Sequence, residues 1–241
     1  MVLMLTMGSC NSRQIGQINN LINSIDVKDQ QGRQDLGNGI YLINGHRFVD
    51  LGLPSGMLWA ENNIGANKPA DTGYFFAWGE TAPKQEYTPE TYKYCNVALK
   101  KMTKYNDQEN HHQKLQKEDD AASVNWGDEC RMPTMLDFGE MKESCTFTAV
   151  DRTNSNGQLV YGFLVTSNVN GNKIFLPAAG TRYENIHEGF NECGTYWLKG
   201  QRTVPCGNFM VFDFHKRDFN FSTSSLERYY GMTIRPVAEP I

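Results

Sequence analysis

Cysteines have the widest reactive chemistry in this sequence, and two of the six lie close together. Cys193 and Cys206 share a stretch that also carries Lys199, Arg202 and Lys216. A thiol becomes a nucleophile or a redox centre when a neighbouring cation lowers its pKa. The same spacing suits a disulfide that closes one loop, provided that the compartment is oxidising. We therefore expect Cys193 and Cys206 to form a structural disulfide, with a redox pair as the alternative.

Other groups of reactive side chains have simpler explanations. Glu118, Asp119 and Asp120 precede a helix-like stretch, where acidic residues favour the first helical turn. His111 and His112 lie in a polar segment and are expected to be solvated. The sequence contains no CxxC pair, no zinc-ligand spacing, no GxSxG motif and no phosphate-binding glycine loop. We therefore expect no metal, no cofactor and no hydrolytic or nucleotide chemistry.

The first ten residues, MVLMLTMGSC, have the pattern that ends a bacterial lipoprotein signal. A short apolar run leads through small residues to Cys10, and it is too short to span a bilayer. We expect residues 1–9 to be a signal remnant, Cys10 to be lipidated, and residues 10–38 to be a polar tether or a segment that docks on the domain. The alternative is an ordinary apolar N-terminus with a buried cysteine.

Composition and charge narrow the class of protein and of partner. The 23 Lys and Arg residues against 27 Asp and Glu give a formal net charge of -4, and no segment forms a basic stripe. Nucleic acid is therefore not an expected partner. The 22 glycines and the aromatic content of 12% are typical of short strands and turns. We expect one α+β domain over residues 39–241, built from short antiparallel strands, two short helices and long irregular loops.

Turn residues predict where the strands fold back on themselves. Asn44-Gly45 and Asn170-Gly171 each separate two alternating apolar runs, which is the pattern of a tight β-hairpin. A third hairpin is expected at NFMVFDFHKRDFNFS, residues 208–222. Residues 84–117 are polar and lack strict periodicity, so we interpret them as a long surface excursion.

Two short helices are expected between the strands. One follows the acidic residues at 118–120 and ends at Gly127. The other is capped by Thr134, and the spacing of Met135, Phe138 and Met141 predicts that these side chains form one buried stripe.

Several segments, in chain order, resemble a known family. They are FVDLGLPSGMLWAENNIGA, GYFFAWGET, EDDAASVNWGDECRMPT, NGNKIFLPAAGTR and RYYGMTIRPV. Together they resemble the FISUMP family of paralogous domains, found in lipoproteins and surface proteins of gut bacteria, and the resemblance covers residues 40–237. It implies a C-type-lectin-like fold, distantly related to formylglycine-generating enzymes and to retroelement-diversified variable proteins. In such a fold the terminal strands pair.

That fold predicts a role for the end of the chain. Residues 229–237, YYGMTIRPV, are expected to form the closing strand and to pair with an early strand near GHRFVDLG. Alternation along the strand places Arg235 on the face opposite Ile234. We interpret Arg235 as a solvated or ion-paired structural arginine, with Asp50 and Asp137 as candidate partners.

The family resemblance implies recognition at the cell surface rather than catalysis. We expect a lipid-anchored protein of the bacterial cell envelope that binds a protein or glycan ligand non-covalently. The ligand surface is expected where the chain departs most from the family pattern and carries side-chain types that are common in binding hot spots. The candidate ligand-binding residues are Trp197, Lys199, Gln201, Arg202, His215, Arg217 and Asp218.

Two alternative functions stay open at this point. One is an oxidase of the formylglycine-generating type that uses Cys193 and Cys206, although NECGTYWLKGQRTVPCGN does not reproduce the active-site pattern of that family. The other is a structural subunit of a surface assembly that exchanges a strand at a sheet edge. The sugar-binding motifs of calcium-dependent C-type lectins do not occur in the sequence.

Overall fold

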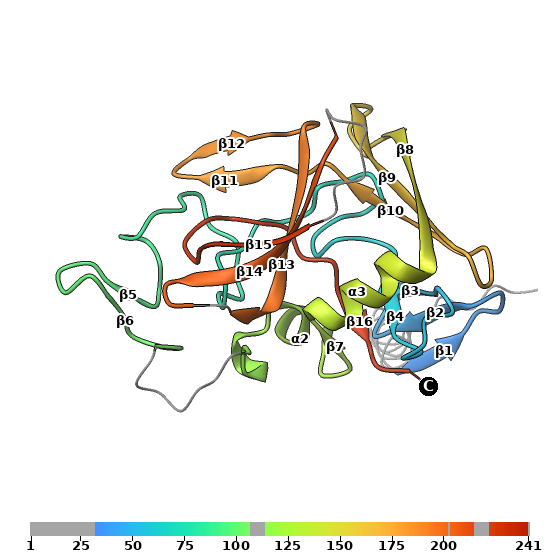
Figure 1. Ribbon diagram of the computed structural model, residues 1–241, viewed down its shortest axis with the longest axis horizontal. Coiled ribbons are helices and arrows are strands. Elements are labelled where there is room, and N and C mark those ends of the chain that lie inside the picture. Colours follow the sequence, from blue (N-terminus) through green and yellow to red (C-terminus); the bar gives the residue numbers. More distant parts are fainter. Residues whose placement is uncertain (1–31, 107–113, 202, 215–221, 241) are drawn as a thin grey trace, which may run out of the picture.

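The computed structural model describes residues 32–106, 114–201, 203–214 and 222–240, and most of its regular structure is antiparallel strand (Figure 1). Within these residues there are two α-helices, α2 (Ala121–Trp126) and α3 (Met135–Ser144), preceded by the short 3-10 helix η1 (Lys117–Asp119). The prediction of short antiparallel strands with two short helices is confirmed. Residues 61–94, which the structure describes throughout, contain no regular strand or helix, as expected for long irregular loops.

The largest sheet contains strands from both ends of the described chain. Its order is β1-β2-β3-β4-β16-β7, and the strands are β1 (Arg33–Asp35), β2 (Ile40–Ile43), β3 (His46–Asp50), β4 (Leu58–Ala60), β16 (Val237–Ala238) and β7 (Cys130–Arg131). Val237 lies opposite Trp59 of β4 on one side and Arg131 of β7 on the other. The end of the chain therefore joins the early sheet as predicted, but only through Val237 and Ala238. The partner of β16 is β4 rather than β3, because β3 already pairs with β2 and β4 along its two edges. The prediction of a continuous strand over residues 229–237 is wrong, because Gly231, Met232 and Thr233 form isolated bridges to Arg182, Phe76 and Tyr196, which lie in three different parts of the chain.

Four smaller sheets complete the regular structure of the described residues. They comprise β8 (Cys145–Thr153), β9 (Leu159–Ser167) and β10 (Lys173–Pro177); β13 (Cys193–Gln201), β14 (Cys206–Asp213) and β15 (Ser222–Glu227); the hairpin β11 (Thr181–Tyr183) and β12 (Ile186–Glu188); and the hairpin β5 (Cys95–Asn96) and β6 (Lys101–Met102). Figure 1 shows the β5–β6 hairpin projecting from one end of the molecule.

The predicted hairpins are present. Asn44 and Gly45 both have positive φ, 49° and 80°, and join β2 to β3 in the two-residue turn that this dipeptide favours. Asn170 and Gly171 lie in the turn between β9 and β10, and Gly171 has a φ of 77°. Strands β14 and β15 form the third predicted hairpin, whose tip lies outside the described residues.

The middle strands of the largest sheet, β3 and β4, have buried side chains on both faces. Phe48, Leu58 and Ala60 pack into one hydrophobic cluster, whereas their neighbours Val49 and Trp59 pack into a second. Successive side chains of a strand point to opposite faces, so this alternation means that the sheet separates two cores.

The described part of residues 84–117, which is 84–106 and 114–117, is not the surface excursion that the sequence predicts. Four tyrosines in this segment are at most 6% exposed, and they are Tyr87, Tyr92, Tyr94 and Tyr105. Asp119 of η1 accepts hydrogen bonds from Tyr94 Oη and from Tyr105 Oη, the latter at 2.6 Å, and forms an ion pair with Lys104. The prediction fails because the tyrosines are separated by polar residues and follow neither the strand period nor the helix period. A search for periodic apolar residues therefore does not detect that their rings are buried.

One smaller packing prediction also needs correction. The sequence predicts Met135 on the buried stripe of α3, but its side chain is 49% exposed. Phe138 and Met141 are buried as predicted.

Arg235 is fully buried and is not ion-paired with either predicted carboxylate. Its Nε donates to Asn63 Oδ1 at 2.7 Å. Its two terminal nitrogens donate to the backbone carbonyls of Ala60, Glu61 and Phe175 at 3.1, 2.6 and 2.9 Å. Burial lowers the pKa of Arg235 to about 10, so the guanidinium remains charged at neutral pH. The interpretation as a solvated or ion-paired arginine is therefore wrong, because backbone carbonyls satisfy this cation instead.

We expect the substitution Arg235→Met to lower the free energy of unfolding by at least about 3 kcal/mol, because each buried acceptor left unpaired costs about 1–3 kcal/mol. Urea denaturation at pH 7 measures this change. Arg152→Met, at an exposed position of β8, is the control and should change stability by less than about 0.5 kcal/mol. Equal stabilities of the two variants would contradict the structural role of Arg235.

Candidate ligand-binding site

A groove lies between the start of α3 and the sheet β13–β14–β15. Its volume is about 450 Å³. It is lined by Lys114, Thr134, Met135, Leu136, Gly200, Gln201, Asn208, Thr223 and Ser224. We call it the α3 groove. It contains one of the predicted ligand residues, Gln201, and it adjoins the strand that carries two others.

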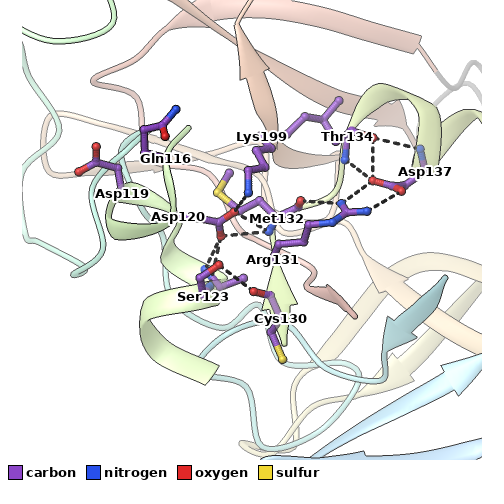
Figure 2. Close-up of polar contacts among 12 residues, drawn as sticks. Gln116, Asp119, Asp120, Ser123, Cys130, Arg131, Met132, Thr134, Asp137 and Lys199 are labelled. Atoms are coloured by element: carbon purple, nitrogen blue, oxygen red, sulfur yellow. Dashed lines mark hydrogen bonds and ion pairs between the residues drawn. The ribbon is translucent and has the colours of Figure 1, made fainter. Parts of the chain in front are cut away.

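The helix that forms one wall starts at a fixed position. Thr134 caps α3 with a capping box, in which Asp137 N donates to Thr134 Oγ1 and Thr134 N donates to the Asp137 carboxylate at 2.6 Å. Arg131 donates two parallel hydrogen bonds of 2.7 and 3.0 Å to the two oxygens of the same carboxylate (Figure 2). Burial alone would raise the pKa of Asp137, but the hydrogen bonds from Arg131 and Thr134 outweigh it and lower that pKa. The carboxylate therefore stays ionised and holds Met135 and Leu136 at the groove.

A second buried carboxylate fixes the strand on the other wall. Asp120 is fully buried and accepts from the backbone nitrogens of Ala122, Ser123 and Met132. Figure 2 shows Lys199 of β13 directed toward this carboxylate, and its Nζ lies 3.1 Å from Asp120 Oδ2. Asp120 thus caps α2, as acidic residues at a helix start are expected to do, and also ties α2 to β13.

Lys199 is consequently a structural residue, although the sequence suggested a ligand contact. Its side chain pairs with Asp120, and its backbone N donates to Pro133 O at 2.8 Å. Its carbonyl accepts from Leu115 N at 3.0 Å. The next two residues, Gly200 and Gln201, line the α3 groove.

The other predicted ligand residues have different outcomes. Trp197 is fully buried and donates its indole N–H to Phe76 O at 2.8 Å, so its prediction as a ligand residue is wrong. The alternation of β13 directs its ring into the core. Gln201 lines the groove and also accepts a hydrogen bond from Arg228. Four further candidates lie outside the described residues: Arg202, His215, Arg217 and Asp218. The same holds for Cys10, His111 and His112.

The predicted disulfide between Cys193 and Cys206 is wrong, because both cysteines are free. Cys193 is the first residue of β13 and lies opposite Asp213, the last residue of β14. Cys206 is the first residue of β14 and lies at the other end of this antiparallel pair, where Gly207 is opposite Gln201. A disulfide requires Cα atoms within about 7 Å. The remaining described cysteines, Cys95, Cys130 and Cys145, are free as well.

These thiols also lack the environment of a redox centre. Burial, followed by the charges of Asp213 and Glu192, raises the pKa of Cys193. Burial and Glu227 raise the pKa of Cys206. A catalytic thiol needs a lowered pKa, so the described surroundings of both residues favour the inert thiol.

The sequence missed most of the residues that line the α3 groove. Asn208 is a polar residue beside the apolar run of β14, and this break in the apolar pattern could have marked it as a candidate ligand-binding residue. Leu136 is 78% exposed next to a helix cap, whereas Thr223 and Ser224 carry no distinguishing pattern. Only the folding of β15 against β14 brings these two hydroxyl groups to the groove.

The groove suits reversible binding more than bond chemistry. Its lining offers the amides of Gln201 and Asn208 and the hydroxyls of threonine and serine, together with the exposed Met135 and Leu136. Lys114 is the one lining residue of the described set with a titratable side chain. Neutral donors and acceptors beside apolar contact area are typical of a site that orients a ligand.

No family model, no curated protein and no solved structure matches this chain. Among the described residues, no helix is long and apolar enough to cross a membrane, and no three His, Cys, Asp or Glu side chains gather in a metal-binding group.

We expect Asp137→Asn to destabilise the protein by about 2–4 kcal/mol at pH 7, because the cap weakens and the partly buried Arg131 loses its partner. The folded-state pKa of Asp137 is below the unfolded value of about 3.9. Its stabilisation is therefore present above that value and is lost as the pH falls through the folded pKa. Wild type should lose more stability than Asp137→Asn between pH 5 and pH 2. Denaturant unfolding at several pH values measures this, with the exposed Asp151→Asn as the control that keeps the wild-type slope.

We expect reductant to leave the unfolding free energy unchanged, because a native disulfide would contribute about 2–5 kcal/mol and the described cysteines form none. Alkylation of the unfolded protein without prior reduction, followed by peptide mass mapping, should find both Cys193 and Cys206 modified. A cross-linked peptide containing the two residues would contradict the structure.

Proposed function

We propose that this chain is a FISUMP-type domain with a C-type-lectin-like fold that binds a protein or glycan ligand non-covalently in the bacterial cell envelope. The observation that carries the proposal is the α3 groove, a polar and apolar recess between two rigidly fixed walls. The proposal makes the protein a receptor or adhesin and not an enzyme.

The fold part of the proposal is supported by how the chain ends. The C-terminal strand β16 lies between β4 and β7 in the same sheet as the first strands, as a C-type-lectin-like domain requires of its termini. The family-like segments also converge in one core. Trp78, Trp126 and Met232 come from three of these segments and pack in the same hydrophobic cluster.

The binding part is supported by rigidity as well as by chemistry. The buried carboxylates of Asp120 and Asp137 each hold one wall, so ordering the site costs little conformational entropy when a ligand binds. Exposed Leu136 gives contact area, while Asn208 and Thr223 supply directional hydrogen bonds to a hydroxyl, an amide or a peptide group.

Localisation is proposed from the sequence. The MVLMLTMGSC pattern supports lipidation at Cys10 and thereby attachment to an envelope membrane, with residues 10–38 as the tether or docking segment. The described end of this segment contains β1, which pairs with β2 in the largest sheet. A lipid anchor on a polar tether would leave the domain free to meet a ligand.

The oxidase alternative has little support. A formylglycine-generating type of mechanism would use Cys193 and Cys206 together, but they lie at opposite ends of the β13–β14 hairpin and their pKa values are raised.

We expect the substitution Leu136→Asp to weaken ligand binding at least about tenfold, because it places a charge in the apolar part of the groove without touching the core. Glycan arrays and immobilised extracellular proteins identify the ligand, and calorimetry then measures its affinity for each variant. Val169→Asp is the matched control, since Val169 is also an exposed apolar residue, 69% accessible, and does not line the groove. Equal loss of affinity in both variants, or none in either, would place the binding site elsewhere.

A further inference from the structure

A cluster of three tyrosine rings lies at the far end of β15 from the α3 groove. Tyr183 closes β11, and Tyr229 and Tyr230 follow β15. The rings of Tyr183 and Tyr230 stack with centroids 4.9 Å apart, and those of Tyr229 and Tyr230 stack at 5.1 Å. All three side chains are half-buried, so part of each remains accessible. We call these residues the tyrosine surface.

The charges around the tyrosine surface are negative. The pKa of Tyr230 is raised by burial and then by the negative charge of Glu227 and Glu188, and the pKa of Tyr229 is raised to about 12 by burial and Glu227. In the part of the chain that the structure describes, neither glutamate belongs to an ion pair.

The neighbouring arginines do not neutralise this surface because they are directed elsewhere. The Arg182 guanidinium lies over the ring of Phe75, 5.2 Å from its centroid. Arg228 is fully buried with its guanidinium 4.7 Å from the ring of Trp78. Both cations face the aromatic core, and the carboxylates stay outside with the tyrosines.

The backbone holds the tyrosines in place before any ligand binds. Arg182 and Gly231 exchange two backbone hydrogen bonds of 2.8 Å, which fixes Tyr183 beside Tyr230. Gly231 is required there, because a Cβ would lie 2.7 Å from the ring of Tyr87. A surface that is already ordered loses little entropy on binding.

A second groove continues from this surface. It has a volume of about 680 Å³ and includes Cys95, Met102 and Pro205 in its lining. Tyr229 packs against the same hydrophobic cluster as Cys95 and Met102. The residue before it, Arg228, donates its backbone N–H to Pro205 O at 3.3 Å, so the tyrosine surface adjoins the groove. The groove carries charges of both signs, Glu90 against Lys100 and Lys101. It has room for the residues that flank a bound side chain.

We propose that the tyrosine surface binds an arginine or lysine side chain of a polypeptide partner, with the neighbouring residues of that partner in the adjoining groove. The face of a tyrosine ring attracts a cation, and the carboxylates of Glu188 and Glu227 add electrostatic complementarity. A neutral oligosaccharide could stack on the rings but would gain nothing from the two charges. This site is separate from the α3 groove and does not depend on the function proposed for it.

The test is the binding of a short acetylated peptide with two arginines to the full chain, measured by calorimetry or NMR titration. The matched probe replaces both arginines by citrulline, which keeps the shape and removes the charge. We expect the arginine peptide to bind at least about fivefold more tightly than the citrulline peptide, with a difference that shrinks at high salt. Maltohexaose serves as the neutral oligosaccharide probe.

Variants locate the site. Tyr230→Leu and Glu227→Gln should each weaken the arginine peptide about fivefold, whereas Tyr230→Phe should retain binding because it keeps the ring. Tyr161→Leu removes a tyrosine that stacks on Phe214 in another sheet and should leave the affinity unchanged. Thermal unfolding confirms that each variant is folded.

The proposal is overturned if the arginine peptide does not bind at millimolar concentration, if the citrulline peptide binds equally well, or if maltohexaose binds and is lost in Tyr230→Leu. Leu136→Asp should leave arginine-peptide binding intact, so a failure of the α3 groove and a failure of the tyrosine surface are distinguished.

Discussion

The buried guanidinium of Arg235 is the interaction on which the rest of the structure depends. It draws together the carbonyls of residues 60, 61 and 175 and the amide of Asn63, and so connects the end of β4, an irregular loop and β10 to the last segment of the chain. Because the guanidinium is buried away from solvent, the protein must supply its hydrogen-bond acceptors, and three backbone carbonyls do so in place of a carboxylate. The C-terminal strand is therefore fixed inside the sheet instead of fraying.

Three buried aspartates provide the second set of fixed contacts. Asp119, Asp120 and Asp137 each bind a different part of the molecule: the tyrosines of residues 84–117, the lysine of β13, and the arginine of β7. Each carboxylate is buried and accepts hydrogen bonds from several donors. Together the three aspartates connect the loops of the domain to the sheet β13–β14–β15 and fix the two walls of the α3 groove.

This arrangement separates the stabilising residues from the surfaces offered to partners. Lys199 and Trp197 make structural contacts. The α3 groove has a lining that is neutral except for Lys114, whereas the tyrosine surface has acidic neighbours. Two surfaces of different chemistry at opposite ends of β15 would let one domain contact two partners at once.

Local sequence determined the features that depend on neighbouring residues. The dipeptides Asn44-Gly45 and Asn170-Gly171 specify their turns because few residues adopt positive φ, and Thr134 specifies a helix start through its side-chain oxygen. The terminal alternation indicated a strand, but only its last residue, Val237, lies in one. Tertiary structure alone decided the partner of that strand, the burial of the tyrosines in 84–117, the separation of Cys193 from Cys206, and the loss of Lys199 to Asp120. These outcomes rest on contacts between residues far apart in the chain, and their pairing is set by packing and desolvation of the whole fold, which no local pattern encodes.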